Sequence, residues 1–133
     1  MAKQFTEFSI TRTFPVTPAE IYYAWLDSDL HTAMTGGHAE CSADEGESFS
    51  AWDGYISGKN IRLVPNKIIC QSWRTTEFLA GDEDSLVELQ LSEMEDGGCQ
   101  LTLIHSKIPQ GQPDYKQGWN EFYFLPMLDY FKK

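Results

Sequence analysis

Residues 115–127 read Tyr-Lys-Gln-Gly-Trp-Asn-Glu-Phe-Tyr-Phe-Leu-Pro-Met, and their large apolar side chains recur at spacings of three and four. This period is typical of an amphipathic helix, and it predicts a long C-terminal helix that begins between Pro113 and Gly118. Pro126 lies inside the pattern, and we expect it to kink the helix or to end its first half, because proline has no N–H to donate. A helix with such an aromatic face must be covered by another layer of structure.

The covering layer is predicted to be an antiparallel sheet, because the middle of the chain consists of short alternating segments separated by turn residues. Asp53-Gly54 is a strong signal for a tight hairpin, and Trp73 shares the alternation of Ile69, so its ring should be buried. The predicted strands comprise residues 7–12, 48–52, 55–64, 67–74, 87–92 and 99–106. Together with the helix they predict an α+β fold in which a curved sheet of six or seven strands grips the C-terminal helix.

Helix signals follow the first of these strands. Thr17 is placed to cap a helix whose first position is Pro18. A second short helix is expected to span residues 28–34, before the Gly36-Gly37 pair ends it. The predicted order is therefore strand, two short helices, a run of strands and a long aromatic helix, all within one domain of residues 1–133.

Composition and charge exclude several classes of partner. Twenty acidic residues against ten basic ones give a net charge of -10, which would repel nucleic acid and anionic lipid surfaces. No apolar run approaches the roughly 18 residues that a membrane span needs. The N-terminus lacks the apolar core of a secretory signal, so we expect a cytoplasmic protein with three reduced cysteines.

The sequence contains no motif for catalysis or metal binding. His31, His38 and Cys41 lie close together, but no second pair completes a tetrahedral set, and we interpret the histidines as loop residues after a helix. A nucleophile motif, a glycine-rich phosphate loop and a metalloprotease signature are all missing. We therefore expect no enzyme activity, no cofactor and no metal.

Four segments, in this order, resemble the activator of heat-shock protein 90 ATPase homologue family, in the form of its C-terminal domain. They are residues 14–21, 49–58, 63–74 and 118–123. The family belongs to the START-like, helix-grip superfamily (SRPBCC), which includes the birch pollen allergen, so the resemblance implies that fold in a stand-alone domain. The chain departs from the family at Ala33-Met34, where a tryptophan is usual, and we expect no room for the further N-terminal domain of the eukaryotic co-chaperones.

The aromatic residues suggest a ligand site between the sheet and the C-terminal helix, because aromatic walls with a few polar tips suit a small apolar ligand. His105 has two interpretations: a polar group inside the cavity, or a neutral core histidine with a hydrogen-bond partner. The predicted ligand-binding residues are Trp52, Trp73, Leu103, His105, Trp119 and Tyr123. Whether these residues surround a pocket or fill a packed core depends on side-chain volumes, and the sequence leaves both open.

Two functions of different classes follow. The first is a non-catalytic domain that binds a small hydrophobic or amphipathic molecule, which requires an internal cavity. The second, implied by the resemblance, is a co-chaperone-like accessory protein that binds heat-shock protein 90 and modulates its ATPase, which requires a surface for the chaperone. Because some START-like proteins are cyclases or isomerases, the fold also leaves an enzyme as a further alternative.

Overall fold

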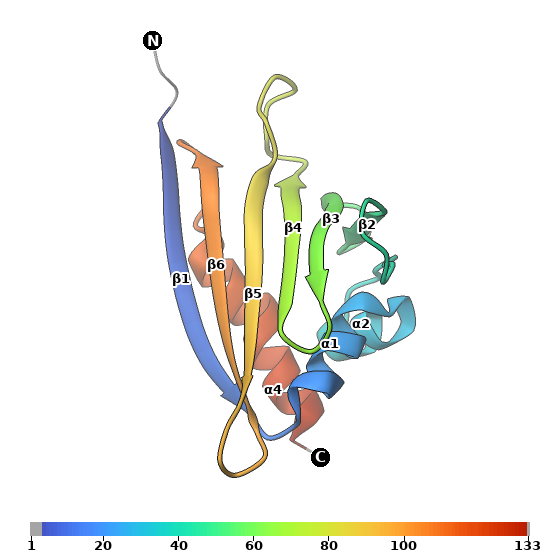
Figure 1. Ribbon diagram of the computed structural model, residues 1–133. Helices are drawn as coiled ribbons and strands as arrows, with labels where there is room; N and C mark the ends of the chain where they lie inside the picture. The colour runs from blue at the N-terminus through green and yellow to red at the C-terminus, as the bar shows by residue number, and fades with distance from the viewer. Residues whose placement is uncertain (1–3, 133) are drawn as a thin grey trace.

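The computed structural model describes residues 4–132, and its centre is a curved antiparallel sheet with the strand order β1-β6-β5-β4-β3-β2 (Figure 1). The strands are β1 (Phe5–Phe14), β2 (Ser48–Ala51), β3 (Ile56–Val64), β4 (Ile68–Thr75), β5 (Ser85–Glu93) and β6 (Cys99–Pro109). Each pair of neighbours is antiparallel. The predicted sheet of six or seven strands is confirmed, with six strands in the described part of the chain.

Helices lie between the first two strands and at the C-terminus, as predicted. The two short ones are α1 (Pro18–Leu26) and α2 (Ser28–Thr35), and the Thr17 hydroxyl accepts a hydrogen bond from the Glu20 N–H at 3.2 Å to cap α1. The C-terminal segment consists of α3 (Tyr115–Trp119), η1 (Asn120–Phe124) and α4 (Leu125–Phe131). It begins inside the predicted range, and Figure 1 shows it running diagonally across one face of the sheet.

Pro126 was expected to kink the helix or to end its first half, and the helical residues continue past it. η1 is a π-helical turn, in which the Leu125 N–H donates to the carbonyl of Asn120, five residues earlier. A proline at position 126 cannot donate to the carbonyl of Phe122, and its ring crowds that carbonyl in a regular α-helix. A wider turn just before the proline accommodates this conflict, so the helical residues continue to Phe131.

The core lies between the concave face of the sheet and the helices. Trp73 is 3% exposed, which confirms the burial predicted from its alternation with Ile69. The central strands contribute aliphatic side chains and the C-terminal helix contributes Phe124 and Met127, both fully buried. α1 packs against β5, and α2 packs against α4, so the two short helices close the remaining side of this core.

The hairpin between β2 and β3 differs from the prediction at its turn. Trp52 and Tyr55 were expected at strand ends, but β2 ends at Ala51 and the turn includes both residues. Trp52, Asp53 and Gly54 all have positive φ, at 53°, 56° and 89°. Asp-Gly favours a tight turn, but the left-handed backbone at Trp52 takes that residue out of the strand and redirects its side chain.

Candidate functional site

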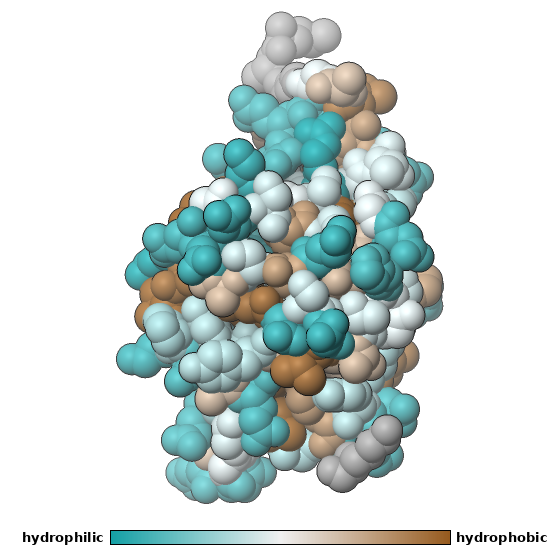
Figure 2. Space-filling view, turned by 90° about the vertical axis from the view of Figure 1, so that its right-hand side faces the viewer, coloured by the Kyte–Doolittle hydropathy of each residue, from teal (hydrophilic) through white to brown (hydrophobic). Residues whose placement is uncertain are grey.

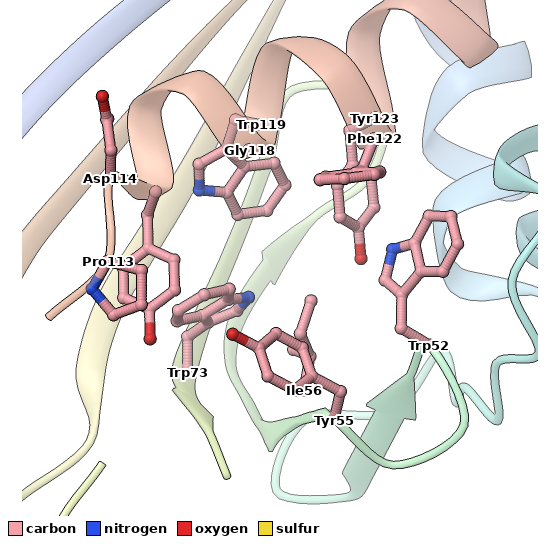
Figure 3. A pocket seen from close by; sticks show the side chains of 11 residues that line it. Trp52, Tyr55, Ile56, Trp73, Pro113, Asp114, Gly118, Trp119, Phe122 and Tyr123 are labelled. Carbon is pink, nitrogen blue, oxygen red and sulfur yellow. The ribbon is translucent and has the colours of Figure 1, made fainter. Parts of the chain in front are cut away.

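A pocket of about 350 Å³ lies between the first half of the C-terminal helix, strand β4 and the β2–β3 turn (Figure 3). The helix side contributes Tyr115, Gly118, Trp119, Phe122 and Tyr123. The sheet side contributes Trp52, Tyr55, Ile56 and Trp73, and Pro113 and Asp114 lie where the chain enters the helix. Most of the lining is therefore aromatic.

The inner wall of the pocket is a rigid group of rings. Trp119 and Tyr123 lie one helical turn apart with ring centroids 4.5 Å from each other, and Trp73 reaches Trp119 from β4 at 5.8 Å. Trp25 of α1 stacks behind them, 6.1 Å from Trp119 and 5.3 Å from Tyr123. Aromatic pairs at these distances restrain one another, so this wall cannot easily collapse into the hollow.

The outer rim is formed by Trp52 and Phe122, whose rings meet edge to face at 5.8 Å. A Cβ added to Gly37 would lie 2.3 Å from Cε3 of Trp52, so the ring packs against a position that tolerates no side chain. Trp52 has a left-handed backbone, which costs a non-glycine residue about 1–2 kcal/mol. Strain of this kind is frequently found at functional sites, and here it fixes the direction of a pocket-lining indole.

The hydroxyl groups around the pocket remain protonated. Burial, together with the nearby Cys41 thiol, raises the pKa of Tyr123, and a hydrogen bond from Trp52 only partly offsets this effect. Burial and the hydrogen bond to Glu77 raise the pKa of Tyr55, whose hydroxyl donates to that carboxylate. Burial also raises the pKa of Tyr115, whose hydroxyl donates to Oε1 of Gln112 at 2.7 Å.

His105 lies behind this wall, and both of its ring nitrogens form hydrogen bonds with protein groups. The Ser85 hydroxyl donates to the Trp73 carbonyl at 2.7 Å, so Nε2–H of His105 donates to the Ser85 oxygen at 2.8 Å. The Trp119 Nε1–H donates to Nδ1 of His105 at 3.1 Å, which fixes the neutral Nε2–H tautomer. The imidazole is fully buried, and this burial lowers the pKa of His105 to about 3.

The structure brings four of the six predicted site residues around the pocket: Trp52, Trp73, Trp119 and Tyr123. Leu103 is fully buried in the core and His105 is sealed behind Trp119, so neither side chain lines the hollow. Of the two interpretations of His105, the geometry corresponds to the neutral core histidine. Sequence reasoning missed Tyr55, which belongs to the turn, and Gly118, a small residue among large ones on the same helix face.

His31 requires a correction to its predicted position. It is not a loop residue but lies in α2, 3% exposed, and its Nδ1–H donates to the Trp25 carbonyl at 2.8 Å. Within residues 4–132 no three His, Cys, Asp or Glu side chains are grouped so that they could hold a metal ion. Cys41, Cys70 and Cys99 are free thiols. In the same part of the chain, no helix combines the length and the apolar character of a membrane span.

A curved antiparallel sheet around a C-terminal helix, with two short helices after the first strand, defines a START-like, helix-grip domain, here with an aromatic pocket beneath the helix. The family model described as "Activator of Hsp90 ATPase homolog 1-like protein" matches residues 15–130, and the chain belongs to this family.

Relatives agree with this assignment. The human "Activator of 90 kDa heat shock protein ATPase homolog 1" is 30% identical over 120 residues, which cover 89% of this chain and 35% of the human protein. The chain thus spans about a third of the length of the curated relatives that it matches. A solved HSP90 activator from Plasmodium falciparum has a TM-score of 0.81 at 23% identity, and covers 90% of this chain and 91% of its own. The CalU16 protein of Micromonospora echinospora has a TM-score of 0.75 at 26% identity, and covers 94% of this chain and 74% of its own.

Proposed function

We propose that this protein is a non-catalytic START-like domain that binds a small hydrophobic or amphipathic molecule in the aromatic pocket. The observation that carries this proposal is the pocket itself, about 350 Å³ in volume and lined mostly by aromatic side chains. Small-molecule sites in proteins fall in the range of about 300–1,000 Å³ and are mostly apolar with a few polar groups. The hydroxyls of Tyr55, Tyr115 and Tyr123 supply such groups here.

The pocket is also preorganised. Trp119 is held by its hydrogen bond to His105 and by stacking on Trp25, and Trp73 packs against the same histidine at 4.6 Å. A ligand therefore does not have to order these rings when it binds, which lowers the entropic cost of association. It would also cover the ring of Phe122, which is 55% exposed, and burial of apolar surface contributes about 25 cal/mol per Å².

The tyrosines of the pocket and the histidine behind it support a non-catalytic role. A general acid or base works best with a pKa near the working pH and with access to the substrate. The pKa values of Tyr55, Tyr115 and Tyr123 are raised, so these phenols stay protonated, and the pKa of His105 is lowered to about 3 behind the wall. Binding rather than proton transfer is what these groups can provide.

Gly118 offers a sharp test of the pocket. A Cβ at this position would meet only Cδ2 of Phe122, at 4.0 Å, so the Gly118→Leu variant should extend a side chain into the hollow without disturbing the helix. Para-tert-butylbenzyl alcohol, a neutral apolar probe, is titrated into the protein while tryptophan fluorescence and binding heat are recorded. Wild type and the matched Gly118→Ala control should bind it with a fluorescence change, and Gly118→Leu should not.

Two results would count against ligand binding in this pocket. One is a flat titration of the wild type with this probe and with a panel of fatty acids, sterols and flavonoids. The other is equal binding by wild type and Gly118→Leu, which would place the probe elsewhere on the protein. Native mass spectrometry of the freshly purified protein adds an independent readout, because a tightly held molecule would appear as a defined mass increment.

Family membership favours a second candidate function, a co-chaperone-like protein that binds heat-shock protein 90 and modulates its ATPase. The human relative carries the name of such an activator. This role requires a surface for the chaperone. The face that carries β2 and α2 shows hydrophobic residues in small separate patches among hydrophilic ones (Figure 2). In an ATPase assay with the chaperone of the same host, a surface-based activity should persist in Gly118→Leu, whereas a pocket-based activity should not.

A further inference from the structure

The charges at the pocket wall are of one sign. None of its lining residues is Lys or Arg, and Asp114 is the lining residue that carries a charge. Arg74 follows Trp73 on β4 but points to the other face of the strand, where its guanidinium bonds to the Asp84 carboxylate at 2.9 Å and to the Asp82 carbonyl at 2.9 Å. Lys116 of α3 borders the grooves on the β1 side of the helix. An anionic head group would therefore find no cationic partner here.

The hydrogen-bonding groups at one end of the pocket are arranged as acceptors. The Tyr55 hydroxyl donates its proton to the Glu77 carboxylate. The Tyr115 hydroxyl donates to Oε1 of Gln112 at 2.7 Å, and the Thr75 hydroxyl lies 2.7 Å from the same tyrosine oxygen. With their protons used inside the protein, the tyrosine oxygens present lone pairs to a ligand. They cannot donate to a carboxylate, and they present partial negative charge to a cation whether or not it carries an N–H.

Negative charge lies close to these acceptors. Asp114 is a lining residue, but its Oδ1 caps α3 by accepting the Gln117 N–H at 3.1 Å, and its side chain is directed away from the pocket rings (Figure 3). Glu77 sits directly behind the Tyr55 hydroxyl. The chain as a whole carries a net charge of -10, which adds an attractive field for a cation and a repulsive one for an anion.

Aromatic rings surround the remaining sides of the hollow (Figure 3). Trp119 and Tyr123 reach in from the helix, Trp73 and Tyr55 from the sheet and its turn, and Trp52 from the rim. A cation near the face of an aromatic ring, above all of tryptophan, is stabilised by the ring quadrupole. Aromatic cages that recognise quaternary ammonium ligands in other proteins use this interaction.

We infer that this pocket selects a hydrophobic organic cation, an amine or quaternary ammonium compound with an apolar body, over fatty-acid-like anions. This inference rests on the proposed ligand-binding function and names the class of ligand. The apolar body occupies the space beneath Trp119 and Tyr123. The ammonium group lies at the end of the pocket where the hydroxyls of Tyr55 and Tyr115 lie, with the Glu77 carboxylate behind Tyr55.

Three probes that share one para-tert-butylphenyl group test the inference. They are para-tert-butylbenzyl-trimethylammonium, para-tert-butylbenzyl alcohol and para-tert-butylphenylacetate, each titrated by calorimetry into the wild-type protein. We expect the ammonium probe to bind about tenfold or more tightly than the carboxylate, an advantage that shrinks as salt is raised. Equal binding of the three overturns the cation preference but leaves the proposed function intact. If none binds, the cation preference is wrong, and a flat titration with the panel of fatty acids, sterols and flavonoids would then overturn the proposed function as well.

Two carboxylate variants locate the charge. Asp114→Asn keeps a residue that can cap α3, and Glu77→Gln keeps an acceptor for the Tyr55 hydroxyl. Glu77→Gln should weaken the ammonium probe about twofold to fivefold and Asp114→Asn by less, and both should leave the alcohol unchanged. Glu95→Gln is the matched control and should change neither affinity. Glu95 lies in the β5–β6 turn, at the far end of β5 from Ser85, the residue that pairs with Trp73. If the ammonium and alcohol affinities fall in parallel, the carboxylates act on structure and the inference is wrong.

Discussion

The interface between the sheet and the C-terminal helix has two halves that differ in packing. From Phe124, the last residue of η1, through α4 it is closed: Phe124 and Met127 are fully buried, and the ring centroid of Phe14 in β1 lies 6.3 Å from those of both Phe124 and Phe131. Under α3 and the preceding residues of η1 it leaves a pocket of about 350 Å³ beside Trp119 and Phe122. The C-terminal helix thus packs tightly on the sheet at one end and leaves a gap between itself and the sheet at the other.

The difference shows how side-chain shape decides between a packed core and a hollow. Met127 in the closed part can adjust its rotamer to fill gaps, whereas the indole and phenol rings beside the pocket are rigid plates. Trp119 is further fixed because its N–H is bound to His105. Gly118 omits a side chain on the pocket side of the helix, so no flexible group is available to close the space.

The largest expected difference between the halves concerns two phenylalanines in η1. Phe124 is fully buried and Phe122 is 55% exposed. Phe124→Ala should lower the free energy of unfolding by roughly 3–5 kcal/mol, as expected for a large buried aromatic, and Phe122→Ala by less than about 1 kcal/mol. Urea titrations followed by circular dichroism measure both values. Similar losses for the two variants would show that the interface is not divided in this way.

The second prediction concerns acid stability. Burial lowers the pKa of His105 to about 3, so between that value and about 6.5 the unfolded chain binds a proton that the native state excludes. Stability therefore falls as the pH falls through this window, by about 2–3 kcal/mol between pH 6.5 and pH 4.5. His31, whose pKa is also lowered by burial, acts in the same direction.

A matched variant isolates the contribution of His105. His105→Gln removes the titrating ring but keeps a donor and an acceptor, and the carboxylates titrate equally in both proteins. The variant should lose about 2–3 kcal/mol less than the wild type over the same pH interval, measured by urea unfolding at both ends. An identical pH dependence in the two proteins would contradict the buried neutral histidine behind Trp119.

The third prediction addresses the rim. A Cβ at Gly37 would overlap the ring of Trp52 at 2.3 Å, so Gly37→Ala must displace that indole. We expect a loss of about 1–2 kcal/mol in stability, the range of local overpacking, and a several-fold loss in binding of para-tert-butylbenzyl alcohol. Gly81→Ala, where an added Cβ meets nothing within 4 Å, is the control. Unchanged probe binding in Gly37→Ala would exclude the rim from the site.

The fold was predictable because its signals are local. The capping residue Thr17, the alternation of Ile69 and Trp73 and the three-to-four spacing of the helix each depend on short stretches of chain, and all three are confirmed. The backbone at Trp52 was not predictable, because its positive φ arises where the turn packs on Gly37, which is distant in sequence.

The site was only partly predictable from the same signals. Alternation places Leu103 and His105 on the concave face, but it does not show which helical residue covers them. In the structure Trp119 lies between His105 and the pocket, and its indole N–H donates a hydrogen bond to Nδ1 of the imidazole. Whether a residue of the concave face lines the pocket or lies behind its aromatic wall depends on the position of the helix on the sheet. No single segment of the sequence determines that position.

The smallest expected effect concerns Gly118, which lies in α3 and lines the pocket. Glycine inside a helix costs about 0.5–1 kcal/mol relative to alanine, and the space around its Cβ position is open. Gly118→Ala should therefore raise the free energy of unfolding by that amount in a urea titration. Gly118→Leu should keep at least part of the gain while it fills the hollow.

A stabilising substitution that abolishes probe binding would mean that the native residue keeps the pocket open at a cost in stability. Such a trade is typical of functional sites and is not expected of an accidental packing defect. The interpretation depends on Gly118→Ala binding the alcohol probe as the wild type does. If Gly118→Ala is destabilising, the helix at this position needs glycine for its own packing, and the open half of the interface is then a consequence of the fold rather than of ligand binding.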